Sequence, residues 1–150
     1  MEIFSPDLIK LKYYALDRKS CISEMAEFLF EKGVTNSLDI FLNEIMEREN
    51  LMSTGIGRNV AIPHARSKAV NEIKIAVYLL DNELDFDSID NEPVKVVFMI
   101  AVPENMKNEY MKVLSGISNF FKIEGNREKL LACGSEKEVY SILKGIGNEI

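Results

Sequence analysis

The 150-residue sequence has one histidine and two cysteines, and this scarcity limits the metal sites and disulfides that it can form. A catalytic zinc ion normally takes three protein ligands, so His64 with Cys21 and Cys133 makes a poor ligand set. The cysteines lie far apart, each within an apolar helical pattern, and we expect reduced thiols that pack as small hydrophobic side chains. We therefore expect neither a bound metal nor a disulfide.

Long apolar runs and basic clusters are also missing. The longest uninterrupted apolar run, from Val96 to Val102, is far shorter than the roughly 20 residues of a transmembrane helix. The first residues lack a basic start followed by an apolar core, so we expect no signal peptide, no membrane insertion and a cytoplasmic location. The net charge of −6 argues against nucleic-acid binding, because nucleic-acid-binding domains usually carry a basic face.

The composition is that of a globular protein, with 47% hydrophobic and 28% charged residues. No linker, repeat or low-complexity tract divides the chain, so residues 1–150 are predicted to form one domain. Strands are expected at residues 8–11, 60–62, 73–80 and 94–102, and a helix with a broad apolar stripe at residues 106–121. Strands interleaved with helices predict an α/β fold in which a mixed β-sheet is sandwiched between α-helices.

Local capping signals predict where the other helices begin and end. Ser20 precedes apolar residues at helical spacing, and Gly33 follows them. A second helix is expected to start near Asn36-Ser37. Asn126 and Ser135 are in positions that suit the N-caps of two final helices. Short polar side chains at these positions accept hydrogen bonds from the first free backbone N–H groups, whereas glycine favours a helix end.

Residues 54–66, with the sequence TGIGRNVAIPHAR, carry the clearest chemical signal. Gly55 and Gly57 allow a tight turn whose N–H groups can approach a bound group. Pro63 removes a backbone donor, so we expect strand pairing to stop there and His64 to begin a loop. An unperturbed imidazole has a pKa of about 6.5, so at neutral pH His64 offers a nitrogen lone pair.

Arginines surround this histidine in the sequence. Arg58 and Arg66 flank it, and Arg48 lies at the end of the preceding predicted helix. A guanidinium keeps its charge and matches phosphate oxygens with a planar fork, which favours phosphoryl over acyl chemistry. Arg48 also fits a plain structural role, as a cation near the negative end of the helix dipole.

Other chemistries that use a histidine lack their partners in this chain. A hydrolase with His64 as general base would need a nucleophile, and no G-x-S-x-G motif is present. The Gly55-x-Gly57 pair lacks the third glycine and following helix of a dinucleotide-binding fingerprint.

The run GIGxxxAIPH over residues 55–64, preceded by the pair Arg48-Glu49, resembles a known family. It is similar to the enzyme IIA domain of the fructose/mannitol type (type 2) of the bacterial phosphoenolpyruvate-dependent sugar phosphotransferase system. The resemblance covers most of the chain and is most specific around His64. It implies that His64 accepts a phosphoryl group from the phosphohistidine of the carrier protein HPr and passes it to a cysteine of a IIB component. Such a phosphotransferase serves sugar uptake and uses no metal or organic cofactor.

The resemblance also implies roles for the residues around His64. Arg48 matches an arginine that stabilises the phosphoryl group in this family. The backbone around Thr54, Gly55 and Gly57 is expected to supply further donors, and Arg66 an additional charge.

Tyr110 marks a departure from the family pattern, because many relatives have a second active-site histidine in a His-Leu pair where this chain has Tyr110-Met111. A phenol donates a hydrogen bond but is not a cation near neutral pH, which leaves more of the stabilisation to Arg48. Tyr110 also begins an apolar helix stripe, so the sequence leaves open whether it faces the site or the core.

A regulatory role is the alternative to sugar transport. Related IIA domains of the nitrogen-regulatory type are phosphorylated similarly but act by binding transporters, kinases or transcription factors. The sequence leaves this choice open, together with the oligomeric state and the phosphorylated nitrogen of His64. For the sugar, the branch resembled favours fructose.

Overall fold

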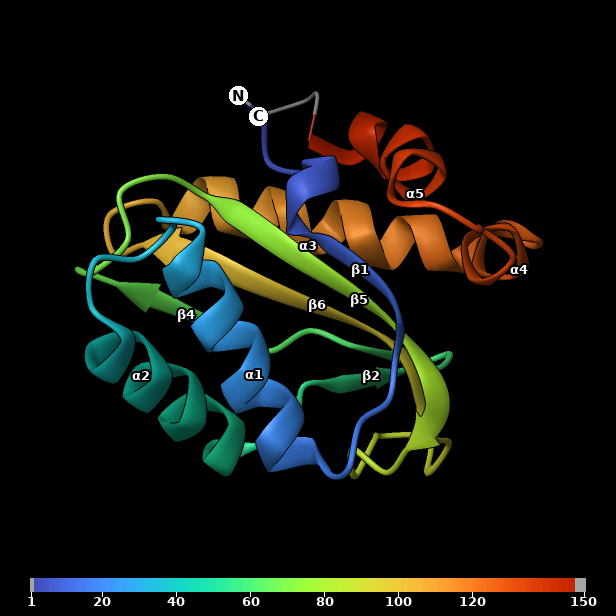
Figure 1. The fold of residues 1–150 in the computed structure, drawn as a ribbon, viewed down its shortest axis with the longest axis horizontal. Helices are drawn as coiled ribbons and strands as arrows, with labels where there is room; N and C mark the ends of the chain where they lie inside the picture. Colours follow the sequence, from blue (N-terminus) through green and yellow to red (C-terminus); the bar gives the residue numbers. More distant parts are fainter. Residues whose placement is uncertain (1, 148–150) are drawn as a thin grey trace.

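The computed structural model describes residues 2–147, which form a six-stranded mixed sheet flanked by helices (Figure 1). The strands are β1 (Ile9–Tyr13), β2 (Gly55–Gly57), β3 (Val60–Ala61), β4 (His64–Ser67), β5 (Lys74–Leu84) and β6 (Val94–Pro103). The helices are α1 (Arg18–Glu31), α2 (Leu38–Leu51), α3 (Lys107–Lys122), α4 (Asn126–Leu131) and α5 (Glu136–Leu143), with 3-10 helices η1 (Pro6–Leu8) and η2 (Lys144–Gly147).

The antiparallel pair β5 and β6 forms the centre of the sheet. The strand order is β1-β5-β6-β3-β2, with β1 parallel to β5 and β2 antiparallel to β3. Both β3 and β4 run parallel to β6, with Val60 opposite Val96 and His64 opposite Ile100. The two short strands therefore follow each other along one side of β6, and the gap between them lies immediately before His64.

The central strands are buried on both faces, as their unbroken apolar runs predict. Tyr78 and Met99 belong to the hydrophobic cluster that packs against α1 and α2, whereas the neighbouring Val77 and Phe98 belong to the cluster that packs against α3 and α5. Figure 1 shows α1 and α2 on one face of the sheet and α3 to α5 on the other. The predicted α/β sandwich is confirmed.

Two of the predicted helix caps are wrong. Asp17, in an extended conformation, caps α1 by accepting a hydrogen bond from the Ser20 backbone N–H over 2.7 Å, so Ser20 lies inside the helix. Gly125, at φ 89°, precedes α4, and Asn126 is its first helical residue. The Asn126 side chain instead donates to the Phe120 carbonyl over 2.9 Å. In both places the true cap is another residue that also favours helix ends.

The predicted helix start near Asn36-Ser37 and the predicted cap at Ser135 are confirmed. Ser37 accepts a hydrogen bond from the Ile40 N–H over 3.3 Å, and Ser135 accepts one from the Glu138 N–H over 3.2 Å. Gly33 follows α1 at φ 79°, the left-handed conformation that glycine adopts without strain.

Both cysteines are free thiols. Cys21 is buried in α1, and burial raises the pKa of its thiol to about 12. Cys133 follows the end of α4, so the prediction that it lies within a helical pattern is wrong, but it is half-buried and packs against the same hydrophobic cluster as α3 and α5. Among residues 2–147, no helix is long and apolar enough to cross a membrane.

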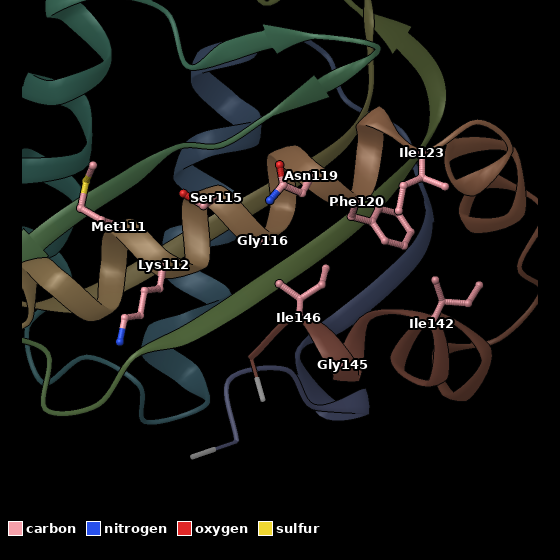
Figure 2. A pocket seen from close by; sticks show the side chains of 10 residues that line it. All are labelled: Met111, Lys112, Ser115, Gly116, Asn119, Phe120, Ile123, Ile142, Gly145 and Ile146. Carbon is pink, nitrogen blue, oxygen red and sulfur yellow. The ribbon is translucent and has the colours of Figure 1, made fainter. Parts of the chain in front are cut away.

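A surface pocket lies on the outer side of α3, where η2 packs against it (Figure 2). At Gly116 of α3, a Cβ atom would lie 2.7 Å from Cγ2 of Ile146 in η2. The absence of a side chain at Gly116 therefore allows η2 to approach α3 closely. This pocket is separate from the His64 region described below.

Candidate functional site

His64 is the first residue of β4, so the prediction that it begins a loop is wrong. Pro63 does interrupt the sheet, because β3 ends at Ala61 and β4 begins only at His64. The Pro63 carbonyl nevertheless accepts a hydrogen bond from the Ile100 N–H over 2.9 Å, and pairing with β6 resumes at once. The strand therefore holds the His64 backbone more firmly than a loop would.

The Ile62 carbonyl lies 2.8 Å from Nδ1 of His64. A carbonyl oxygen can only accept a hydrogen bond, so Nδ1 must carry the proton in this contact. In the neutral ring the lone pair is then on Nε2. The Ile62 carbonyl, in the interruption between β3 and β4, thus selects one tautomer and leaves the lone pair on Nε2.

Three influences act on the His64 imidazole. Burial, the largest of them, lowers the pKa of His64 because it disfavours the charged ring, and the nearby Arg48 charge lowers it further. The hydrogen bond to Ile62 acts in the opposite direction but does not prevail, so the pKa lies below 6.5. His64 is therefore neutral at neutral pH.

Arg48 lies in the last turn of α2, beside His64. Its Nη1 donates a hydrogen bond to the Met52 carbonyl over 2.7 Å, which fixes the guanidinium at the point where the chain leaves the helix. Arg48 and His64 line the same two surface clefts. The structure therefore brings together the two residues that the sequence assigned to catalysis.

Tyr110 of α3 packs against the imidazole. The ring centroids of Tyr110 and His64 are 5.0 Å apart with an interplanar angle of 38°, and Tyr110 is 9% exposed. Burial raises the pKa of the Tyr110 phenol, although Arg48 and Arg66 act in the opposite direction, so the phenol keeps its proton. Tyr110 is both a core residue and a neighbour of His64, and the two alternatives that the sequence left open do not exclude each other.

Two clefts meet at Arg48, His64 and Tyr110, and their linings differ in character. One carries the charged residues Glu44, Glu47, Arg66 and Glu104. The other is more apolar and is lined in part by Met52, Thr54, Gly55, Ile56, Ile62, Ile89 and Leu114. The two clefts at His64 thus differ, with charged side chains in one and mainly hydrophobic side chains in the other.

Glu49 is a residue of this region whose role sequence reasoning missed. It is 3% exposed, and its two carboxylate oxygens accept hydrogen bonds from the backbone N–H and the hydroxyl of Thr54, over 2.8 and 2.7 Å. The signal was present in the sequence, because Glu49 continues the i, i+4 series of Phe41 and Ile45, the buried face of α2.

The backbone donors at the start of the glycine loop already have partners within the protein. The Thr54 N–H bonds to Glu49, and the Gly55 N–H donates to the Ser53 hydroxyl over 3.0 Å. Thr54 and Gly55 do line the apolar cleft, whereas Gly57 lines neither cleft at His64. These internal bonds argue against the expectation that the amides of Thr54 and Gly55 cradle a bound group.

The two glycines instead allow close contact between β2 and residues 85–90. A Cβ atom on Gly55 would lie 2.9 Å from the Cα of Ser88, and Gly57 has φ +91° with Asp90 close by. Arg58, next in the chain, donates through its guanidinium to the Phe121 carbonyl over 2.8 Å and lines neither cleft at His64. Of the arginines considered, Arg48 and Arg66 are the ones that border His64.

A family model described as "Phosphoenolpyruvate-dependent sugar phosphotransferase system, EIIA 2" matches residues 2–146 of the chain. The chain belongs to this family. The EIIA domain is 31% identical to the fructose-specific EIIA component of Haloferax volcanii, over 91% of this chain and 89% of that protein. It is 33% identical to the fructose-specific EIIABC component of Bacillus subtilis, over 95% of this chain but only 22% of that longer protein.

Nitrogen regulatory proteins are also among the relatives of this EIIA domain. It is 28% identical to the one from Bradyrhizobium diazoefficiens, over 95% of this chain and 92% of that protein. The crystal structure of IIA-Ntr from Neisseria meningitidis matches with a TM-score of 0.88 and 33% identity, over 94% of this chain and 96% of the other. IIA mannitol of Escherichia coli, in complex with phosphorylated IIB mannitol, shares the fold with a TM-score of 0.82 at 22% identity, over 95% and 99% of the two chains.

The protonation of His64 in the EIIA domain is expected to have its midpoint below pH 6.5. Because folding lowers the pKa, the unfolded chain binds the proton first, so folding stability falls as the pH drops below 6.5 and levels off below the folded pKa. At any pH near 6.5, a larger fraction of the His64 imidazole should therefore be neutral in the folded domain than in the unfolded chain. NMR titration of the single imidazole measures this, and a midpoint above 6.5 would contradict the assigned surroundings.

Substituting alanine for Gly55 is expected to destabilise the EIIA domain by about 1–3 kcal/mol, the usual effect of overpacking. The added methyl group would meet the Ser88 backbone as well as its side chain. Denaturant unfolding measures the change. Gly134→Ala is the matched control, because nothing lies within 4 Å of a Cβ atom there, and its stability should stay within about 0.5 kcal/mol of the wild type. Equal stability of the two variants would contradict the close packing at Gly55.

Proposed function

We propose that this EIIA domain accepts a phosphoryl group from phospho-HPr on Nε2 of His64 and passes it to a cysteine of a IIB component. This would make it a phosphocarrier in coupled sugar uptake and phosphorylation, with fructose as the expected sugar. The observation that carries the proposal is the hydrogen bond from Nδ1 of His64 to the Ile62 carbonyl beside Arg48. It leaves a neutral ring with its lone pair on Nε2.

The proposed transfer has two balanced steps. First, the Nε2 lone pair forms a bond to phosphorus while the N–P bond of the HPr phosphohistidine breaks, and the HPr imidazole keeps that electron pair. Second, a IIB thiolate attacks phosphorus, and Nε2 regains its lone pair as the N–P bond breaks. Positive charge develops on the His64 ring when Nε2 is phosphorylated, and the Ile62 carbonyl dipole stabilises that charge through the Nδ1 proton.

Phosphoryl transfer also needs positive charge or donors near the three equatorial oxygens. We assign this role chiefly to Arg48, with the Tyr110 hydroxyl as a neutral donor and Arg66 as a more distant charge. Thr54 and Gly55 then act by shaping the apolar cleft, whereas Gly57 lines neither cleft at His64. No metal or organic cofactor is needed for this scheme.

The surface around His64 supports docking of another protein. Large apolar side chains rarely gather on a free surface unless they serve contacts, and docking of two active sites requires a rim from which water can be displaced. The exposed apolar residues that line the two clefts, here called the apolar rim, are Leu51, Met52, Ile56 and Ile89. HPr and IIB are the proposed partners for this rim.

Incubation of the protein with phosphoenolpyruvate, enzyme I and HPr tests the proposal. Mass spectrometry should show one added phosphoryl group that is labile in acid and stable in base, as expected of a phosphohistidine. Phosphorylation of HPr in the same mixture shows that phosphoenolpyruvate and enzyme I are active. If HPr is phosphorylated but the protein gains no mass, the proposal is refuted.

Regulation is the second candidate function, and the nitrogen regulatory relatives favour it. In that case the phosphorylated protein would act by binding a target protein instead of supplying a permease. Adding a fructose-type IIB component to the phosphorylated domain separates the two. Rapid loss of the phosphoryl group to IIB supports transport, whereas a phosphoryl group that stays on His64 supports regulation.

A further inference from the structure

Glu49 is the only charged residue that is buried among residues 2–147. Burial of a carboxylate is unfavourable by several kcal/mol unless partners compensate for the lost water. Glu49 has partners for both oxygens, and it lies next to Arg48, which borders His64. Its position therefore suggests a role at the site in addition to any role in stability.

The hydrogen bonds of Glu49 bridge the turn between α2 and β2. Two hydrogen bonds join its carboxylate to Thr54, five residues further on. Nη1 of Arg18, at the start of α1, lies 3.9 Å from Oε2 of Glu49 and donates to the Phe86 carbonyl over 3.2 Å. Ser53 also donates to the Phe86 carbonyl. The buried carboxylate thus fixes residues 52–54 against α1 and residues 85–90.

Those fixed residues in turn hold the catalytic arginine. Nη1 of Arg48 donates to the carbonyl of Met52 over 2.7 Å. Met52 lies between Glu49 and Thr54, so the carbonyl that orients the guanidinium belongs to the turn that the Glu49–Thr54 bonds close. Without these bonds, the Met52 carbonyl would lose its fixed position and Arg48 its orientation toward His64.

From these contacts we propose that Glu49 is a positioning residue for phosphoryl transfer, acting through Met52 and Arg48. The proposal rests on the phosphocarrier function proposed above. A guanidinium placed in advance stabilises the transition state without reorganisation, and a misplacement of about 1 Å can slow a reaction up to about 100-fold. The maximal rate should therefore respond to Glu49 more than the KM for phospho-HPr does.

Glu49→Leu removes both acceptors and is expected to lower kcat about 10- to 100-fold with little change in KM. Glu49→Gln should stay within about threefold of the wild type, because its amide can accept from the Thr54 N–H and donate to the Thr54 hydroxyl. Glu27→Leu, at an exposed position of α1, is the matched control and should leave the rate unchanged. If Glu49→Leu does not fold, Thr54→Val, which removes one of the two bonds, should lower kcat about threefold to tenfold.

A double-mutant cycle separates positioning from general destabilisation. In an Arg48→Ala background, Glu49→Leu should slow transfer by no more than about twofold, because the residue through which it acts is already gone. A full additional loss in that background would overturn the proposal, as would an unchanged kcat in the folded single variant.

NMR titration of His64 gives a readout that does not depend on the phosphorylation cascade. Because the Arg48 charge lowers the pKa of His64, displacement of Arg48 by Glu49→Leu should raise that pKa toward its value in Arg48→Ala. The other titratable residues that line the clefts at His64 are the same in both variants and so do not account for a difference in its pKa. They are Arg66, Glu44, Glu47, Glu104, Asp87 and Tyr110. An unshifted His64 in Glu49→Leu would overturn the inference even if phosphorylation proceeds. If the pKa of His64 rises in Glu49→Leu as expected, but phospho-HPr does not phosphorylate the protein, the result would refute only the proposed function.

Discussion

Substitution of alanine for His64 is expected to abolish phosphorylation by phospho-HPr. The chain contains no other imidazole. The hydrogen bond to the Ile62 carbonyl occupies Nδ1 of His64 and leaves Nε2 to attack the phosphoryl group of phospho-HPr. Attack by a side chain forms the covalent intermediate itself, so its loss removes the reaction path instead of slowing it. Mass spectrometry after incubation with phosphoenolpyruvate, enzyme I and HPr should show no phosphorylated His64→Ala protein.

NMR of the same phosphorylated sample locates the phosphoryl group within the ring. Because Nδ1 is committed to the Ile62 carbonyl, NMR of the phosphorylated wild type should show phosphorus on Nε2 and a proton on Nδ1. Circular dichroism should confirm that His64→Ala is folded, since His64 is only half-buried. Labelling that persists in folded His64→Ala would place the acceptor elsewhere, and phosphorus on Nδ1 would contradict the tautomer assigned from the hydrogen bond.

Local patterns in the sequence were enough to predict the main elements of this fold. The apolar run of residues 94–102 identifies the central strand β6 because a strand with helices on both faces needs apolar residues on both sides. Ser37 identifies the start of α2 because its hydroxyl satisfies a free backbone N–H. The position of Arg48 could be predicted as well, because the last turn of this helix places it near the glycine loop.

Features that depend on contacts between distant segments were not predictable in the same way. His64 lies in a strand because its backbone pairs with Ile100 of β6, and nothing near His64 in the sequence specifies that partner. The sequence around Gly55 resembles a binding loop. The structure instead requires glycine there because the backbone of Ser88, 33 residues later, leaves no room for a Cβ atom. Asp17 and Ser20 are both good caps, and local preference does not choose between them.

The role of Glu49 lies between these cases. Its spacing from Phe41 and Ile45 indicates a buried position, yet a buried carboxylate contradicts the usual polar pattern of a helix. Conflicts of this kind between local rule and structure are expected at functional sites. Both exceptional features of this site, the buried Glu49 and the strand break before His64, fix groups that surround one imidazole.

Removal of the guanidinium by Arg48→Ala is expected to slow phosphoryl transfer about 100- to 1000-fold, the usual effect of losing one donor that stabilises transition-state charge. Tyr110 can donate a hydrogen bond but brings no positive charge, so it should not replace Arg48. Arg48→Lys keeps the charge without the planar fork and should fall between Arg48→Ala and the wild type. Stopped-flow or quenched-flow transfer from phospho-HPr measures the rates.

Stability and the His64 titration distinguish this catalytic role from a structural one. The hydrogen bond from Arg48 to the Met52 carbonyl lies near the surface, so its loss should lower the free energy of unfolding by no more than about 1 kcal/mol. The pKa of His64 should rise in Arg48→Ala, because a positive neighbour is removed. Arg127→Ala is the matched control, since Arg127 contacts Asn59 and Glu128 and lines neither cleft at His64. If Arg48→Ala unfolds, or transfers at the rate of Arg127→Ala, then Arg48 supports the helix end and the phosphoryl group is stabilised by other residues.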